Sequence, residues 1–217
     1  MAKGLDLYVR DIFIDDWNSV QADTQYQGEG SSHELASLLI TEVIQHSKYT
    51  SLMPIFLLFL DAESAFDKVV IPYLIRSFYM AGMEGHSALY MENRLASRIT
   101  FCEFDKCAAG PIHDEQGLEQ GGVSSSDSYK IYNNELLTVA QTSCLGVELS
   151  NSLTVSAVGQ ADDVALLSNN LGSLDLLFHL TKEYCTKYNV KLSSSKTKLM
   201  VISPPNKPSI VCYNQAW

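Results

Sequence analysis

The sequence predicts an α+β fold: an antiparallel sheet of split βαβ (ferredoxin-like) topology, with helices on one face. Three observations lead to this prediction. Apolar runs of strand length alternate with segments of helical periodicity along the 217 residues. An acidic turn separates two neighbouring apolar runs, which is typical of a hairpin within a sheet. Hydrophobic residues make up 46% of the chain, which is enough for a core and excludes a largely disordered protein.

The first half of the chain is expected to contain three helices and two strands. Residues 31–34 (SSHE) form a capping box, and the apolar residues up to Val43 share one face of the helix that follows. The continuous apolar run over 55–60 predicts a strand buried on both faces. Pro72 opens a helix that Gly82 ends, and a further helix over 87–96 precedes a strand over 99–104.

The second half is expected to contain two helices and four strands. Residues 105–123 are polar and rich in turn formers, so no element is expected there. The pattern then predicts a helix over 124–140, strands over 145–149, 153–158 and 164–167, a helix over 174–188 and a last strand over 198–202. Pro204 and Pro205 end this strand.

Charge and cysteine content exclude several classes of protein. The net charge of −10 disfavours unspecific attraction to nucleic acids or anionic membranes. The five scattered cysteines form neither a zinc motif nor a disulfide framework. No apolar run approaches the length of a membrane span, and acidic residues near the N-terminus exclude a signal-peptide core. We therefore expect an intracellular protein (cytoplasm or nucleus) that has no membrane partner.

Two acidic sites adjoin strongly apolar strands. Asp61 follows the strand over 55–60, and Asp162 and Asp163 lie between two strands of the expected hairpin. Three carboxylates at one sheet edge would be hard oxygen ligands that suit Mg²⁺, and two such ions can activate a hydroxyl and stabilise a leaving phosphate. The alternative is a tight turn whose acidic groups face water. Asp15-Asp16 also follows an apolar stretch, without any other sign of a site.

Four ordered motifs connect these sites to a known family. Residues 59–69 read FLDAESAFDKV, residues 117–126 read GLEQGGVSSS, residues 160–167 read QADDVALL and residues 190–197 read VKLSSSKT. In this order and at this spacing they resemble the reverse transcriptase domain of non-LTR (LINE-type) retrotransposons. Residues 25–32 (QYQGEGSS) are weakly similar to the segment that leads into the palm of these enzymes. The resemblance extends from about Gln25 to Ser203.

The resemblance implies a polymerase palm that binds two Mg²⁺ ions, with Mn²⁺ as an alternative. Asp61, Asp162 and Asp163 would be the metal-binding catalytic carboxylates. Lys196 would be the cation near the leaving pyrophosphate, and its alternative is a solvated lysine at a strand end. The implied activity is RNA-directed DNA polymerisation, in which a primer 3′-hydroxyl attacks the α-phosphate of a dNTP opposite an RNA template.

The resemblance also implies a set of substrate-binding residues. Phe66 stands where the family has an aromatic gate, and a ring there would exclude the 2′-hydroxyl of a ribonucleotide by a steric clash; its alternative is a core aromatic. Gln120 and Gly121 would support the template and the incoming nucleotide, because glycine permits close approach of the backbone.

The sequence departs from the family in several places. Gln160 replaces an aromatic residue and Ser126 replaces a proline. Residues 1–47 contain only two basic side chains, and fourteen residues follow Ser203. We therefore expect a palm with partial fingers and no thumb, encoded by a truncated retroelement. The expected boundaries are partial fingers or an irregular segment over 1–30, the fingers/palm domain over 31–203 and a C-terminal tail over 204–217.

Two other functions remain open. The chain could be an inactive retroelement remnant, since a primer–template needs fingers and a thumb to hold it unless a partner chain supplies the missing thumb segment. Residues 57–63 (LLFLDAE) are also loosely similar to the nucleophile strand of haloacid-dehalogenase-like phosphatases. That chemistry requires an acid/base aspartate at position 63, where this chain has the longer Glu63.

Overall fold

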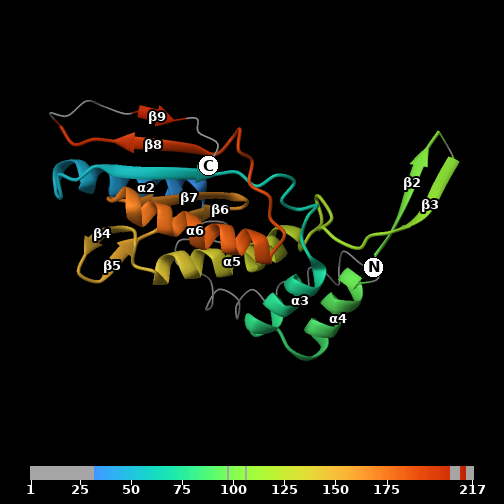
Figure 1. Ribbon diagram of the computed structural model, residues 1–217. Helices are drawn as coiled ribbons and strands as arrows, with labels where there is room; N and C mark the ends of the chain where they lie inside the picture. The colour runs from blue at the N-terminus through green and yellow to red at the C-terminus, as the bar shows by residue number, and fades with distance from the viewer. Residues whose placement is uncertain (1–31, 97, 106, 206–210, 214–217) are drawn as a thin grey trace. The chain divides into compact units, whose positions relative to one another are not determined.

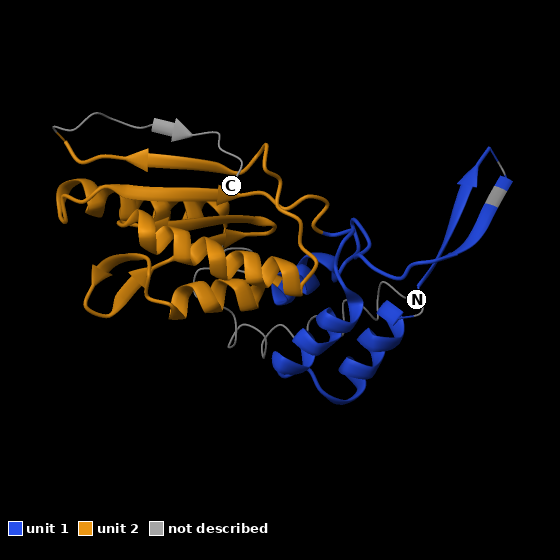
Figure 2. Cartoon of the chain, in the orientation of Figure 1, with its two compact units in different colours: residues 1–20, 66–132 blue, residues 21–65, 133–217 orange. Residues whose placement is uncertain are grey.

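A computed structural model describes residues 32–96, 98–105, 107–205 and 211–213 (Figure 1). These residues fall into two compact units, coloured in Figure 2. The first unit contains Phe66–Tyr132 and the second contains the described parts of Gln21–Ala65 and Asn133–Trp217. The expected segment over 1–30 lies outside the described residues. None of the described helices is both long enough and apolar enough to cross a membrane.

The second unit is built on a five-stranded antiparallel sheet of order β6-β7-β1-β8-β9. Its strands are β1 (Ile55–Leu60), β6 (Ala157–Gln160), β7 (Asp163–Ser168), β8 (Lys198–Ile202) and β9 (Val211–Tyr213). Because β7 lies between β1 and β6, and β1 lies between β7 and β8, the first four have split βαβ topology. The predicted α+β class and sheet topology are confirmed.

Helices cover both faces of this sheet, whereas the sequence led us to expect them on one face. The helix α2 (His33–Tyr49) contributes Ala36 and Val43 to a core with Leu57 and the other odd-numbered residues of β1. Leu58 points to the opposite face, where it lies against α6 (Leu171–Lys187). Strand β1 is buried on both faces, so it requires a helix on each. The prediction was wrong because periodicity shows that a helix is amphipathic, not which sheet face it covers.

A smaller ribbon and the helix α5 complete this unit. Strands β4 (Val147–Ser150) and β5 (Leu153–Val155) pair as the hairpin expected around Asn151. The predicted strand over 153–158 is divided at Ser156 into β5 and β6, because β5 pairs with β4 and β6 pairs with β7. The helix α5 (Ser125–Thr142) begins in the first unit and ends in the second, where Leu137 would contact any Cβ added at Gly159 of β6.

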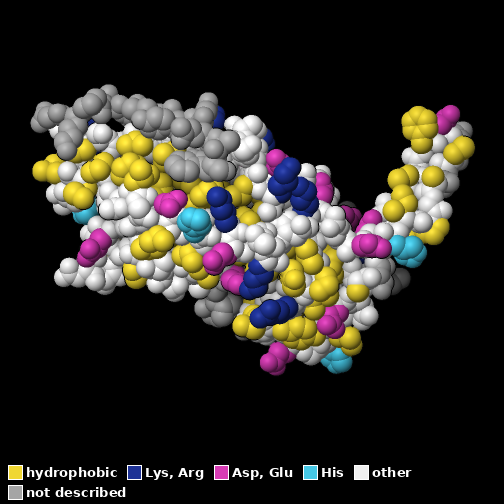
Figure 3. Space-filling view, in the orientation of Figure 1, with side chains coloured by type: hydrophobic (Ala, Val, Ile, Leu, Met, Phe, Trp, Pro, Cys, Tyr) yellow, Lys and Arg dark blue, Asp and Glu magenta, His cyan; other side chains and the backbone are white. Residues whose placement is uncertain are grey.

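The first unit contains a helical pair and a hairpin. Helices α3 (Ile71–Met80) and α4 (Gly85–Ala96) pack together, and β2 (Ile99–Phe104) pairs with β3 (Cys107–His113). Strand β3 was not expected, because its sequence contains Gly110 and Pro111, which usually interrupt strands. The hairpin carries apolar side chains, which Figure 3 shows in yellow. Its large exposed hydrophobic residues are Ile99, Phe101, Phe104 and Ile112.

The C-terminal end differs from the expected tail in one respect. The chain returns to the sheet after Pro204-Pro205, and β9 pairs with β8 through Leu199↔Tyr213 to Val201↔Val211. The two prolines end β8 as predicted, but a three-residue strand such as β9 is too short to show a periodic pattern.

Candidate active site

The register of the sheet brings Asp61 and Asp163 to the same rim. The last pair between β1 and β7 is Leu60↔Val164. If this antiparallel register is continued by one residue, Asp61 lies opposite Asp163. Residues directly opposite each other in such a pair have Cβ atoms about 4.5–5.5 Å apart. Asp162 belongs to the two-residue tip between β6 and β7. The structure therefore brings the predicted carboxylates of the second unit to one region.

The tip of the β6–β7 hairpin has a constrained backbone. Gln160 pairs with Asp163, and between them Ala161 has a positive φ of 58°. This left-handed conformation costs roughly 1–2 kcal/mol for a residue with a Cβ atom. The buried side chain of Asn133 on α5 donates a hydrogen bond from Nδ2 to the Ala161 carbonyl at 3.4 Å. Sequence reasoning assigned no role to Asn133, which holds the backbone next to two of the acidic residues.

The carboxylates interact electrostatically. The pKa of Asp163 is raised, first because its carboxyl group is partly buried and then because the charges of Asp162 and Asp61 repel its own. The ammonium group of Lys196 acts in the opposite direction on this pKa. The site therefore has an excess of negative charge that a single lysine offsets only in part.

Lys196 is the cation of this site. Its Nζ lies 3.2 Å from Oδ1 of Asp61, and both side chains are partly exposed, at 69% and 25%. A turn holds it there: the Ser193 amide donates to the Asp61 carbonyl at 2.8 Å, and the Thr197 amide donates to the Ser193 carbonyl at 2.9 Å. The role expected for Lys196, that of the cation near the leaving pyrophosphate, stays a prediction.

The donor set fits a divalent cation, but it is not assembled as a finished metal site. Oδ2 of Asp61 is buried and has no hydrogen-bond partner within the described part of the chain. Such an oxygen, beside two further carboxylates, suits a hard cation such as Mg²⁺. However, no group of three or more His, Cys, Asp or Glu side chains within the described ranges is arranged so that it could hold a metal ion. Ion binding would have to draw the carboxylates together.

Phe66 lies in the first unit and has a defined packing partner. Its ring stacks on the buried Tyr129 of α5, with centroids 4.9 Å apart and planes inclined by 22°. Phe66 itself is only half-buried. A ring that is held on one face and remains partly accessible is compatible with both alternatives considered from the sequence, a gate and a core aromatic.

Gln120 and Gly121 lie in a loop that docks on the segment after Phe66. Nε2 of Gln120 donates to Oδ1 of Asp67 at 3.2 Å, and the Leu118 amide donates to the Phe66 carbonyl at 2.7 Å. Gly121 has a φ of +78° and open space where a Cβ would be. Within this unit, the structure therefore brings the second motif next to the end of the first one.

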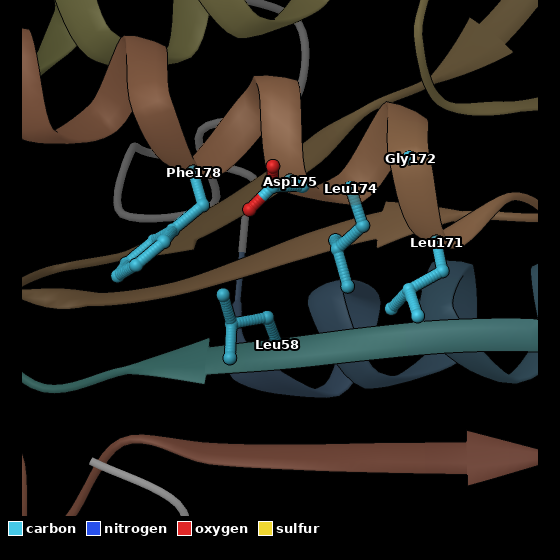
Figure 4. A pocket seen from close by; sticks show the side chains of 6 residues that line it. All are labelled: Leu58, Leu171, Gly172, Leu174, Asp175 and Phe178. Atoms are coloured by element: carbon cyan, nitrogen blue, oxygen red, sulfur yellow. The ribbon is translucent and has the colours of Figure 1, made fainter. Parts of the chain in front are cut away.

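A cavity of the second unit lies away from the acidic rim. It measures about 310 Å³ and lies between β1 and α6, lined by Leu58 and by Leu171, Gly172, Leu174, Asp175 and Phe178 (Figure 4). None of the predicted site residues lines it. Its lining is mostly apolar and offers no set of catalytic groups.

Comparisons with known proteins point to one family. The model of the family described as "Reverse transcriptase (RNA-dependent DNA polymerase)" matches residues 29–213. No curated protein matches the sequence significantly. Among solved structures, apo telomerase from Candida tropicalis is similar with a TM-score of 0.68 at 12% identity, covering 94% of this chain and 37% of that one.

Two further telomerase structures are similar. The Candida tropicalis telomerase in complex with a TWJ fragment of telomeric RNA gives a TM-score of 0.67 at 13% identity, covering 93% of this chain and 34% of that one. The corresponding Candida albicans complex gives 0.59 at 11% identity, covering 92% and 34%. At these identities the likeness concerns the fold alone. This chain spans about a third of the length of those it matches.

Proposed function

The chain belongs to the reverse transcriptase family, and from this premise we propose that it is the palm of an RNA-directed DNA polymerase. The observation that supports this most is the register of the sheet, in which Asp61 and Asp163 face each other across β1 and β7 with Asp162 beside them. Nucleotidyl transfer requires carboxylates at one rim that hold divalent ions between the primer end and the nucleotide phosphates.

Each residue of this rim has a proposed task. Asp61, Asp162 and Asp163 hold two Mg²⁺ ions, or Mn²⁺ in their place. When bound, these ions supply activation of the primer 3′-hydroxyl and neutralise charge on the leaving pyrophosphate. Lys196, whose exposed and flexible side chain is paired with Asp61 here, would be the cation that offsets the charge of the leaving pyrophosphate.

The substrates are an RNA template, a DNA primer and dNTPs. Phe66 is proposed to exclude the 2′-hydroxyl of ribonucleotides, and its stacking on Tyr129 supports this by fixing the plane of the ring. Gln120 and Gly121 support the template and the nucleotide; the open space at Gly121 is suited to a close approach of the backbone.

Primer extension tests this proposal. Purified protein is incubated with poly(rA)/oligo(dT), dTTP and Mg²⁺, and incorporation of dTMP is measured. We expect incorporation that requires Mg²⁺, is lost in Asp162→Asn and persists in Glu148→Gln, which alters an exposed carboxylate on β4. Incorporation that survives in Asp162→Asn would contradict the proposed role of the rim.

The inactive-remnant alternative predicts a different result. A remnant would fold but would neither extend a primer nor bind an RNA–DNA hybrid at low salt, whereas micromolar, salt-sensitive binding would contradict this alternative. The phosphatase alternative is not favoured, because the family match covers both acidic sites and Glu63 is paired with Lys191 at 2.7 Å. Origin from a non-LTR retroelement remains part of the proposal.

A further inference from the structure

The side chain of Gln160 lies on the same face of the sheet as those of Asp163 and Asp61. It pairs directly with Asp163 across β6 and β7. Val158, two residues before it, and Ala165, two residues after Asp163, both belong to the core under α2. Because side chains alternate along a strand, Gln160 and Asp163 point to this same face, beyond the part that belongs to the core. Asp61 follows the same alternation after Phe59, which packs against that core.

Two buried oxygen atoms of these residues lack the hydrogen-bond donor that a buried acceptor requires. They are Oε1 of Gln160 and Oδ2 of Asp61, both shielded from solvent and without a hydrogen bond from any described residue. Buried acceptors are normally satisfied, and each exception calls for a physical explanation. Gln160 on β6 and Asp61 at the end of β1 lie on either side of Asp163 on β7. A cation held at Asp163 is a group that could take a lone pair from each of the two atoms.

We propose that the Gln160 side chain contributes its amide oxygen as a further ligand to a divalent cation bound by Asp61 and Asp163. This inference rests on the proposed function, because it assumes that these carboxylates bind the ion. Amide oxygens are hard ligands of the kind that Mg²⁺ and Mn²⁺ accept. A neutral ligand has one advantage here: it adds an oxygen to a rim where the carboxylates already repel one another.

Gln160 stands where the family motif has an aromatic residue. The aromatic residue of the family motif has no carbonyl oxygen at this place, so it cannot ligate an ion as an amide does. A chain with Gln160 would therefore bind its ion with one more protein ligand and one fewer water molecule than a variant that carries an apolar side chain there.

Mn²⁺ binding to the full chain tests this inference without any measurement of activity. Binding is followed by electron paramagnetic resonance of free Mn²⁺, and water-proton relaxation reports the water molecules that remain on the bound ion. We expect Gln160→Met to weaken binding by about tenfold and to raise the relaxation rate per bound ion, because water replaces the lost ligand. The matched control is Gln45→Met on the exposed surface of α2, which should change neither value.

The outcomes separate this inference from the proposed function. If the wild type binds Mn²⁺ and Asp61→Asn abolishes binding, the carboxylate site stands. Equal affinity and relaxation in the wild type and Gln160→Met would then overturn the role of Gln160 alone. Tighter binding in Gln160→Met would also overturn it, since this would show that the amide competes for a carboxylate oxygen. Absence of Mn²⁺ binding in the wild type would overturn both.

Discussion

Gly117 offers a direct test of how the second motif is attached to the first. Its φ is +85°, and a Cβ added there would lie 2.8 Å from the carbonyl oxygen and 3.0 Å from Cα of Asp67. The neighbouring backbone is fixed by the hydrogen bond from the Gly117 amide to the Val69 carbonyl at 2.8 Å. Because the atoms that a methyl group would meet belong to backbone, they cannot rotate away.

Gly121 is the matched control for Gly117→Ala. It also has a positive φ, of +78°, but no atom lies within 4 Å of an added Cβ. Gly121→Ala should therefore cost only the conformational penalty of about 1–2 kcal/mol. Gly117→Ala should cost this penalty and about 1–3 kcal/mol more for the overlap. At about 2–4 °C per kcal/mol for a chain of this size, the variants should differ in Tm by about 2–12 °C.

Thermal and urea unfolding followed by circular dichroism measure this difference. If Gly117→Ala does not accumulate as a folded protein, the same comparison is made from the yield of soluble protein and from urea midpoints at low temperature. Equal loss of stability in the two variants would refute the reasoning, because it would mean that the segment after Phe66 does not contact the loop as described.

Three further predictions concern ionisable groups. The raised pKa of Asp163 means that the folded state binds this proton more tightly than the unfolded state, so stability falls as pH rises above the ordinary value of 3.8. Asp163→Asn should therefore raise Tm in EDTA at pH 7 by about 1–3 °C, and should have no effect once the carboxyl is protonated in both states; a lowered Tm at pH 7 would contradict this. Lys196→Gln should tighten Mn²⁺ binding up to about fivefold, because the ion no longer competes with an ammonium group for Asp61. Binding is measured by titration followed by electron paramagnetic resonance, and a weaker affinity in the variant than in the wild type would contradict this. Burial raises the pKa of Cys185 to about 11, so about a thousandth of it is thiolate at pH 8. Peptide mapping after iodoacetamide treatment should show slow modification there, and rapid modification at the exposed thiols of Cys102, Cys107 and Cys144.

The elements that were predictable are those with a local cause. Strand β1 follows Pro54 and consists of apolar residues only, and α6 shows its buried face as a helical repeat of Leu174, Leu177 and Phe178. The face that α2 covers could not be predicted, because it depends on which side of β1 remains open once α6 is in place. Strand β3 could not be predicted either, since pairing with β2 outweighs the local preference of Gly110 and Pro111.

For the proposed site, the sequence provides candidate residues but does not show how the fold holds them. Asp61 and the pair Asp162-Asp163 stand out because charge beside apolar strands is costly. Their juxtaposition depends on a register between β1 and β7 that no single segment encodes. The bond from Asn133 to the hairpin tip was likewise not predictable, because a polar residue on a helix carries no signal of what it will contact.

Affinity cleavage tests most directly whether one ion binds among all three aspartates. Fe²⁺ replaces Mg²⁺, ascorbate and hydrogen peroxide generate hydroxyl radicals at the bound ion, and mass spectrometry locates the broken peptide bonds. We predict cuts clustered around residue 61 and around residues 160–163, suppressed by excess Mg²⁺ and absent from Asp61→Asn. Cuts at only one of these two segments, or cuts that Asp61→Asn leaves unchanged, would contradict the account.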